Sequence, residues 1–233
     1  MKQLLGTFLI GTGLVTAAGA ATISSVASSS LPGPSTGSIG PVGATPSPNN
    51  DNTAAASPNT VPASIFFNAL GTVEYEFVVA NSGGTTEYTF TQAAVNNSGQ
   101  AWSGYRFELG YGTGTSFTSA AGLGGPEFDL PARDPSPLSS QFTVLDHQGA
   151  ILHWSGASVP SVGSVFFSFA VDVPDGLSST HPLALDRFTL RATPEVTAPI
   201  PEPATLLLMA GGLAVVGWRR RSRSPAGSGT VSR

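Results

Sequence analysis

The chain of 233 residues contains no cysteine and little charge. The absence of cysteine excludes disulfide bonds, thiolate metal sites and cysteine nucleophiles. Lys2 is the only lysine, and just 10% of the residues are Asp, Glu, Lys or Arg. Residues 22–201 carry four cations and thirteen acids, so their net charge is 4 − 13 = −9, against −4 for the whole chain. Because an acidic surface repels phosphate backbones, we expect no nucleic-acid ligand.

The N-terminus has the order of parts found in a secretory signal peptide. A short cationic start with Lys2 precedes the apolar run 4–15, and the small residues Ala18-Gly19-Ala20 follow. Signal peptidase cuts after small residues in this position. We therefore predict a signal peptide over residues 1–20, its removal by signal peptidase, and export of the remaining chain.

The next segment, residues 21–62, consists mainly of Pro, Ser, Thr, Gly, Ala and Asn. Ile39 and Val42 are rare apolar residues within it. A segment of this composition buries too little apolar surface to offset the entropy lost on ordering. The sequence therefore predicts a disordered linker over residues 21–62.

From residue 63 to residue 195, apolar and polar residues alternate with the period of two that a half-buried β-strand requires. Strands are expected around residues 73–79, 87–90, 105–109, 165–171 and 187–191. Clusters of Gly, Asn and Pro separate these segments, and none shows a convincing helical period. We predict an all-β fold over residues 63–195, a single antiparallel β-sandwich of Ig-like or jelly-roll layout, followed by a linker at 196–200.

The C-terminus consists of three consecutive parts. The tetrapeptide Pro201-Glu202-Pro203-Ala204 begins them, and an apolar run ends at Trp218. A basic cluster follows, made up of Arg219, Arg220, Arg221 and Arg223. A helix over 204–218 would be about 22 Å long, which is short for a hydrocarbon core of ~30 Å. The arginines would stay in the cytoplasm, so we predict a short transmembrane helix, an external body and a cytoplasmic tail at 224–233.

This tripartite arrangement resembles the PEP-CTERM sorting signal of Gram-negative bacteria, and the resemblance covers residues 201–223. It implies that an exosortase processes the chain in the inner membrane. The ectodomain would then reach the cell surface or the exopolysaccharide matrix. The tail at 224–233 departs from the pattern, because such tails usually end sooner, and an uncut membrane anchor is the alternative. Residues 95–110 are also similar to a segment of secreted β-domains of the choice-of-anchor group, for which no general activity is assigned.

Few side chains in the predicted domain suggest chemistry. His147, His153 and His181 are spaced too irregularly for a helical zinc pair, and the Gly-x-Ser-x-Gly elbow of many hydrolases is absent. The glycine-rich segment 110–114 lacks the Lys-Ser/Thr ending of a phosphate loop. We therefore predict no catalytic residue and no cofactor.

Acidic side chains in loops are the better candidates for a ligand site. Carboxylate oxygens on loops suit Ca²⁺, although the spacing typical of EF-hands is absent. The candidate ligands are Glu127, Asp129, Asp134, Asp172 and Asp175. Calcium is thus the one metal that the sequence leaves open.

The leading hypothesis is a non-enzymatic, exported cell-surface or matrix protein that is anchored in the inner membrane only during sorting. A carbohydrate-binding module for extracellular polysaccharide is the first alternative. Its stacking faces would be supplied by Trp102, Tyr105, Tyr111 and Trp154, although core packing is the favoured interpretation of Trp102. A secreted hydrolase is the second alternative, and it would need an open cleft with two carboxylates or a Ser–His pair.

Overall fold

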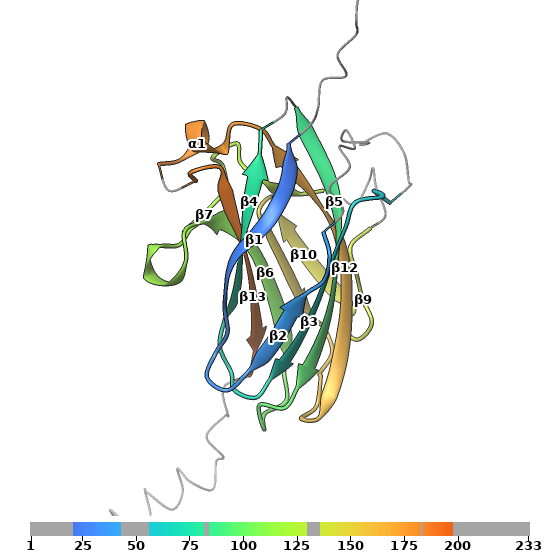
Figure 1. The fold of residues 1–233 in the computed structure, drawn as a ribbon. Helices are drawn as coiled ribbons and strands as arrows, with labels where there is room; N and C mark the ends of the chain where they lie inside the picture. The colour runs from blue at the N-terminus through green and yellow to red at the C-terminus, as the bar shows by residue number, and fades with distance from the viewer. Residues whose placement is uncertain (1–20, 43–55, 82–83, 130–135, 183, 198–233) are drawn as a thin grey trace, which may run out of the picture. The chain divides into compact units, whose positions relative to one another are not determined.

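We describe a computed structural model of the chain (Figure 1). The described residues are 21–42, 56–81, 84–129, 136–182 and 184–197. The chain divides into two compact units, residues 1–196 and 197–233. All the strands and helices named below belong to the first unit.

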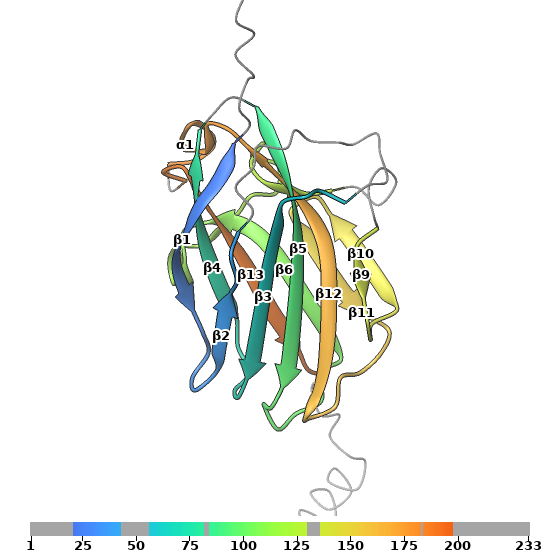
Figure 2. The ribbon, with the colours of Figure 1, turned by 45° about the vertical axis from the view of Figure 1, so that its right-hand side comes forward.

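Two β-sheets pack face to face (Figures 1 and 2). Sheet A has the order β1-β4-β13-β6-β11-β10, and β7 pairs with β6. Its strands are β1 (Thr22–Ser30), β4 (Val73–Ala80), β6 (Gly104–Tyr111), β7 (Thr118–Ser119), β10 (Val144–Gln148), β11 (Ile151–Ser155) and β13 (Arg187–Glu195). Sheet B has the order β2-β3-β5-β12-β8, and β9 pairs with β12. Its strands are β2 (Thr36–Ile39), β3 (Thr60–Phe67), β5 (Thr85–Asn96), β8 (Glu127–Phe128), β9 (Leu138–Ser139) and β12 (Gly163–Pro174).

The predicted all-β sandwich is confirmed. Helical structure in the described residues is limited to a 3₁₀ turn, η1 (Gly114–Ser116), and one short helix, α1 (Leu177–Thr180). One detail of the prediction is wrong, because β3 and β5 run parallel whereas we expected antiparallel pairs throughout. The chain changes sheet at every connection from β3 to β6 and from β11 to β13. This alternation favours the jelly-roll layout over the Ig-like one, in which strands A and B, D and E, or F and G share a sheet.

Aromatic side chains from the inner faces of both sheets form the centre of the core. Tyr105 of β6 lies 4.6 Å from Phe167 of β12, measured between ring centroids. Phe107 of β6 lies 4.6 Å from Phe169 of β12. Each fully buried aromatic side chain stabilises the fold by roughly 1.5–3 kcal/mol. These contacts join the two sheets across the sandwich.

The predicted linker at 21–62 is wrong for most of its described residues. Strands β1 and β2 lie within it, and β3 begins at Thr60, so the sandwich begins near residue 22 rather than at residue 63. Strand β1 pairs antiparallel with β4, and Ile23 is buried in the core. Two register shifts, after Ile23 and after Val26, interrupt the period of two and hide this strand from pattern analysis. Residues 43–55 lie outside the described residues.

The connections gather at two ends of the sandwich. The end where β13 finishes, at Glu195, contains connections 31–35, 68–72, 97–103 and 156–162, and we call it the C-terminal end. The other end, where β1 begins, contains connections that include residues 112–126 and 175–186, and we call it the N-terminal end.

No helix among the described residues is long and apolar enough to cross a membrane. The predicted transmembrane helix at 204–218 lies outside the described residues.

Candidate functional site

The four aromatic side chains that we predicted to stack on glycans lie in the core instead. Trp102, Tyr105, Tyr111 and Trp154 are all buried. A sugar ring stacks only on an aromatic face that it can reach, so this prediction is wrong. Trp102 packs edge-on against Phe67 with 5.1 Å between ring centroids, which agrees with the core-packing alternative.

Burial also determines the state of the tyrosine hydroxyls. Burial raises the pKa of Tyr105 well above its usual value, and repulsion from Tyr75 adds to this, while a hydrogen bond from Gln92 Nε2 opposes it. Burial raises the pKa of Tyr88 as well, although Tyr88 Oη accepts a hydrogen bond from the Ile23 backbone N–H at 2.7 Å. These side chains therefore serve as neutral core residues.

The three histidines have three different environments. His153 Nε2 lies 2.9 Å from Glu195 Oε2 near the C-terminal end. The ring of His181 stacks on that of Tyr111 at 5.3 Å, and His147 Nε2 lies 3.2 Å from the Gly149 carbonyl oxygen. This arrangement assigns each histidine to a local structural contact.

Three buried carboxylates do meet, on the face of sheet B that points away from the core. Glu87 of β5 and Asp172 of β12 are direct cross-strand partners, and Asp129 follows β8. One carboxylate oxygen from each lies within 4.8 Å of the other two. Two ionised carboxylates at about 5 Å repel each other by roughly 3 kcal/mol at an effective dielectric constant of 20. The cluster therefore needs compensating positive charge or shared protons.

These three residues are the ones that could hold a cation, since hard oxygen ligands suit Ca²⁺. In the described part of the chain this is the one group of three potential metal ligands. Asp129 and Asp172 were among the ligands predicted from sequence, whereas Glu127 and Asp175 are not in the group and Asp134 lies outside the described residues. Calcium binding stays a prediction.

Sequence reasoning missed Glu87. Its position in the alternating strand pattern marks it only as a residue that points away from the core. The β5–β12 register places it opposite Asp172, 85 positions further along the chain, and no local signal encodes that pairing.

A cavity of about 270 Å³ lies beside the carboxylates at the N-terminal end. Its wall combines strand ends with a glycine-rich loop and includes Thr85, Gly122, Gly124, Gly125, Glu127, Gly149, Asp172 and Pro174. Glu127 and Asp172 are direct cross-strand partners, so two carboxylates border this cavity. The Ser–His pair that the hydrolase hypothesis also allowed is absent from its lining residues.

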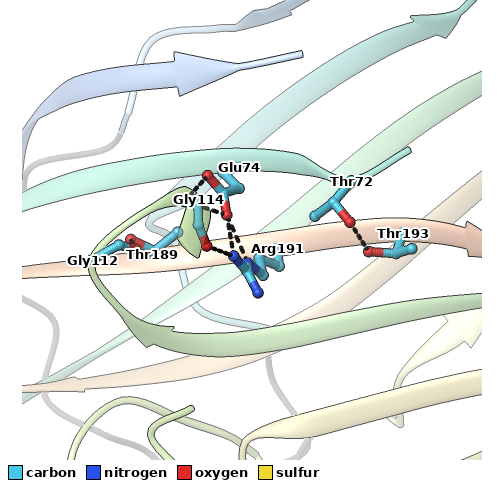
Figure 3. A network of polar contacts seen from close by, with 7 residues as sticks. All are labelled: Thr72, Glu74, Gly112, Gly114, Thr189, Arg191 and Thr193. Atoms are coloured by element: carbon cyan, nitrogen blue, oxygen red, sulfur yellow. Dashed lines mark hydrogen bonds and ion pairs between the residues drawn. The ribbon is translucent and has the colours of Figure 1, made fainter. Parts of the chain in front are cut away.

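A second polar network holds the loop between β6 and β7 (Figure 3). Glu74 of β4 is buried and accepts the Gly114 backbone N–H with both carboxylate oxygens, at 3.0 and 2.8 Å. Arg191 of β13 donates from Nε to Glu74 at 2.7 Å and from Nη2 to the Gly114 carbonyl at 2.6 Å. Its guanidinium also lies 3.7 Å above the Phe117 ring centroid. In the glycine-rich segment 110–114, residues 110 and 111 thus end β6, and residues 112–114 belong to a clamped loop.

The comparisons with known proteins identify the C-terminal segment. The PEP-CTERM protein-sorting motif matches residues 199–221, which include the Pro201–Ala204 tetrapeptide, the apolar run and three of the four clustered arginines. No curated protein and no solved structure matches the chain. The similarity to choice-of-anchor domains therefore has no support from these comparisons. The matched residues lie outside the described residues.

Proposed function

We propose that this PEP-CTERM sorting domain-containing protein is a non-enzymatic component of the cell surface or of the exopolysaccharide matrix. The observation that carries the proposal is the sorting motif at residues 199–221, which marks an exosortase-sorted extracellular protein. The β-sandwich, acidic over residues 22–201, is the part that the sorting step delivers to the outside.

Each targeting residue has a role in the proposed sequence of events. Signal peptidase removes residues 1–20, and the helix at 204–218 then holds the chain in the inner membrane. The arginine cluster, Arg219, Arg220, Arg221 and Arg223, keeps the tail in the cytoplasm. The exosortase cuts near Pro201–Ala204, and the released domain joins the exopolysaccharide.

The domain itself supports a structural role. All four tyrosines and both tryptophans of the described residues are buried, so these six side chains stabilise the core rather than a ligand. The net charge of −9 over residues 22–201 favours a hydrated, soluble surface. Both features suit a protein that remains outside the cell.

Intact-mass measurement of the protein released at the cell surface tests the sorting step. We expect the mature form to lack residues 1–20 and the residues after about Pro203. Glu202→Ala should retain the chain in the membrane, whereas the control Thr197→Ala, which precedes the matched motif, should be released normally. A mature form with the complete C-terminus would contradict exosortase cleavage.

Cell fractionation tests the destination. We expect the mature protein to remain with the exopolysaccharide after gentle washing and to be lost from that fraction in a strain that makes no exopolysaccharide. Recovery of all mature protein in the free medium of both strains would refute matrix association.

A hydrolase at the cavity is the second candidate function, because Glu127 and Asp172 border it as cross-strand neighbours. Paired carboxylates are the groups that glycoside hydrolysis uses. The test is the release of reducing sugar from extracted exopolysaccharide. Glu127 is exposed, so Glu127→Gln should leave the fold intact; activity that this variant abolishes would replace the non-enzymatic proposal.

A further inference from the structure

Three apolar side chains are exposed together at the C-terminal end of sheet B. The exposed fractions are 85% for Val162, 45% for Phe66 and 42% for Phe166. Phe66, near the end of β3, pairs with Val95 of β5, and Val95 pairs in turn with Ser164 of β12. Phe166 lies two residues further along β12, and Val162 immediately precedes that strand. We call Phe66, Val162 and Phe166 the apolar rim.

Val162 is exposed despite an unfavourable backbone conformation. Its φ of 60° lies in the left-handed region, which β-branched residues strongly avoid. The conformation is held by a 2.6 Å hydrogen bond from the Val162 N–H to the Asn96 carbonyl and by the Gly163 N–H, which donates to the Pro160 carbonyl at 2.9 Å. The core does not need this side chain, which is left free to contact a partner.

The connections and the sheet B strands next to the apolar rim contain few charged residues. The four connections of the C-terminal end, 31–35, 68–72, 97–103 and 156–162, contain no Asp, Glu, Lys, Arg or His. Strands β2, β3 and β9 contain none either. Glu195 is the acid at this end of β13, and it is paired with His153.

Six of the acids lie toward the opposite end, whereas Glu74, Glu76 and Glu108 of sheet A are paired with arginines. The six are Glu87, Glu127, Asp129, Asp172, Asp175 and Asp186. The domain therefore has a neutral, partly apolar end and an acidic end. Anionic lipid headgroups repel the acidic end, so the neutral end is the one that can approach a membrane surface.

Chain connectivity brings the same end to the membrane. Strand β13 finishes at Glu195 in the C-terminal end, and eight residues separate it from the apolar run that begins at Ala204. Eight extended residues span at most about 28 Å. While the chain is held in the bilayer, its covalent link limits how far the neutral end can move from the lipid.

We propose that the apolar rim rests in the interfacial layer of the membrane during sorting, with the acidic end directed away from the lipid. The exposed Phe and Val side chains exchange water for lipid, and no ionised side chain of the surrounding connections has to be desolvated. The proposal rests on the membrane-held intermediate of the proposed function. Cleavage at the motif removes the link and leaves only a weak apolar contact, which permits release.

The absence of cysteine makes a site-specific test possible. The full chain is prepared as two single-cysteine variants, Val162→Cys and Leu185→Cys, each labelled with an environment-sensitive dye. Leu185 is the matched control, because it is 70% exposed and also has a positive φ, of 42°, but lies at the acidic end beside Asp186. Both are reconstituted into phosphatidylcholine–phosphatidylglycerol vesicles, and circular dichroism confirms that each is folded.

We expect aqueous iodide to quench the dye at residue 162 at least threefold less than the dye at residue 185. Nitroxide-labelled lipids should quench only the dye at residue 162. Adding Phe66→Ser and Phe166→Ser to the Val162→Cys variant should restore iodide quenching. A Phe166→Cys variant, labelled in the same way, provides a second position on the rim.

The outcomes separate the inference from the proposed function. A chain that floats with the vesicles but shows equal iodide quenching at residues 162 and 185 overturns the inference alone. A chain that does not float with them overturns both membrane anchoring and the inference. A dye at residue 162 that is shielded from iodide, yet not quenched by nitroxide lipids, overturns the lipid contact in favour of a second copy of this chain.

Discussion

The tyrosine hydroxyls illustrate how single residues depend on the core. Tyr75, Tyr88 and Tyr105 each have a raised pKa, and burial is the main cause in all three. In the sequence, aromatic residues that alternate with polar ones are compatible both with rings buried in the core and with rings exposed for stacking on sugars. The packing of the two sheets buries the tyrosine rings and so decides between these two alternatives.

Alkaline pH should unfold the domain and ionise its tyrosines together. An unfolded tyrosine ionises near pH 10, whereas the native state retains the protons of Tyr75, Tyr88 and Tyr105. The contribution of these three tyrosines to the free energy of unfolding is therefore fully present below about pH 10. It falls as the pH rises further, by up to about 1.4 kcal/mol per pH unit for each residue. Tyrosinate absorbance and circular dichroism should change with the same midpoint. Tyrosinate formation in a domain that stays folded would contradict this.

Two arginines on β13 should differ in their contribution to stability. Arg191 pairs with the buried Glu74, whereas Arg187 pairs with Glu76 and has a side chain that is 44% exposed. We expect Arg191→Gln to reduce the free energy of unfolding by about 2 kcal/mol, because it leaves a buried carboxylate with less compensation. The matched control Arg187→Gln should cost less than about 1 kcal/mol. Urea denaturation of both variants measures the difference, and equal costs would contradict the proposed role of the clamp.

At the scale of elements, β1 is the main departure from the sequence prediction. Serine and alanine make up most of the strand, and such a composition indicates disorder when the segment is considered alone. In the fold, the backbone of β1 pairs with β4 along nearly its whole length, while Ile23 is buried in the core and Val26 packs against it. Backbone pairing with a neighbouring strand thus replaces the apolar pattern as the source of order.

A substitution in β1 distinguishes a core strand from a linker. We expect Ile23→Ala to lower the free energy of unfolding by about 2–4 kcal/mol, because Ile23 is only 1% exposed and its loss leaves a cavity. Ser25→Ala, two residues away at an exposed position, should change it by less than about 0.5 kcal/mol. Thermal unfolding compares the two, and equal effects would show that β1 contributes nothing to the core.

At the scale of the whole molecule, charge is distributed by function. Six of the ten cations lie in the predicted signal peptide and within or after the sorting motif, whereas thirteen of the fourteen acids lie in residues 22–201. Within the domain, six of these acids lie toward the N-terminal end, and the connections 31–35, 68–72, 97–103 and 156–162 of the C-terminal end carry no charge. The targeting segments are therefore cationic, whereas the domain is acidic.

Processing should make the protein more acidic. Removing residues 1–20 and the residues after Pro203 takes away six cations and no acid, which changes the net charge from −4 to −4 − 6 = −10. The mature form should therefore focus at a lower pH than the full chain on a native isoelectric gel. An unchanged focusing position would indicate that the C-terminal arginines are retained.

The sequence by itself determined the β-sandwich class and the sorting signal, because both depend on local order along the chain: a period of two, and a motif followed by an apolar run and arginines. Tertiary structure alone decided three other points, namely the inclusion of β1 in the domain, the burial of Trp102 and Tyr111, and the meeting of Glu87 with Asp172. Each of these depends on which distant strands pair and in what register. Local periodicity carries no information about that choice, because every register of the same parity leaves the apolar residues on the same face.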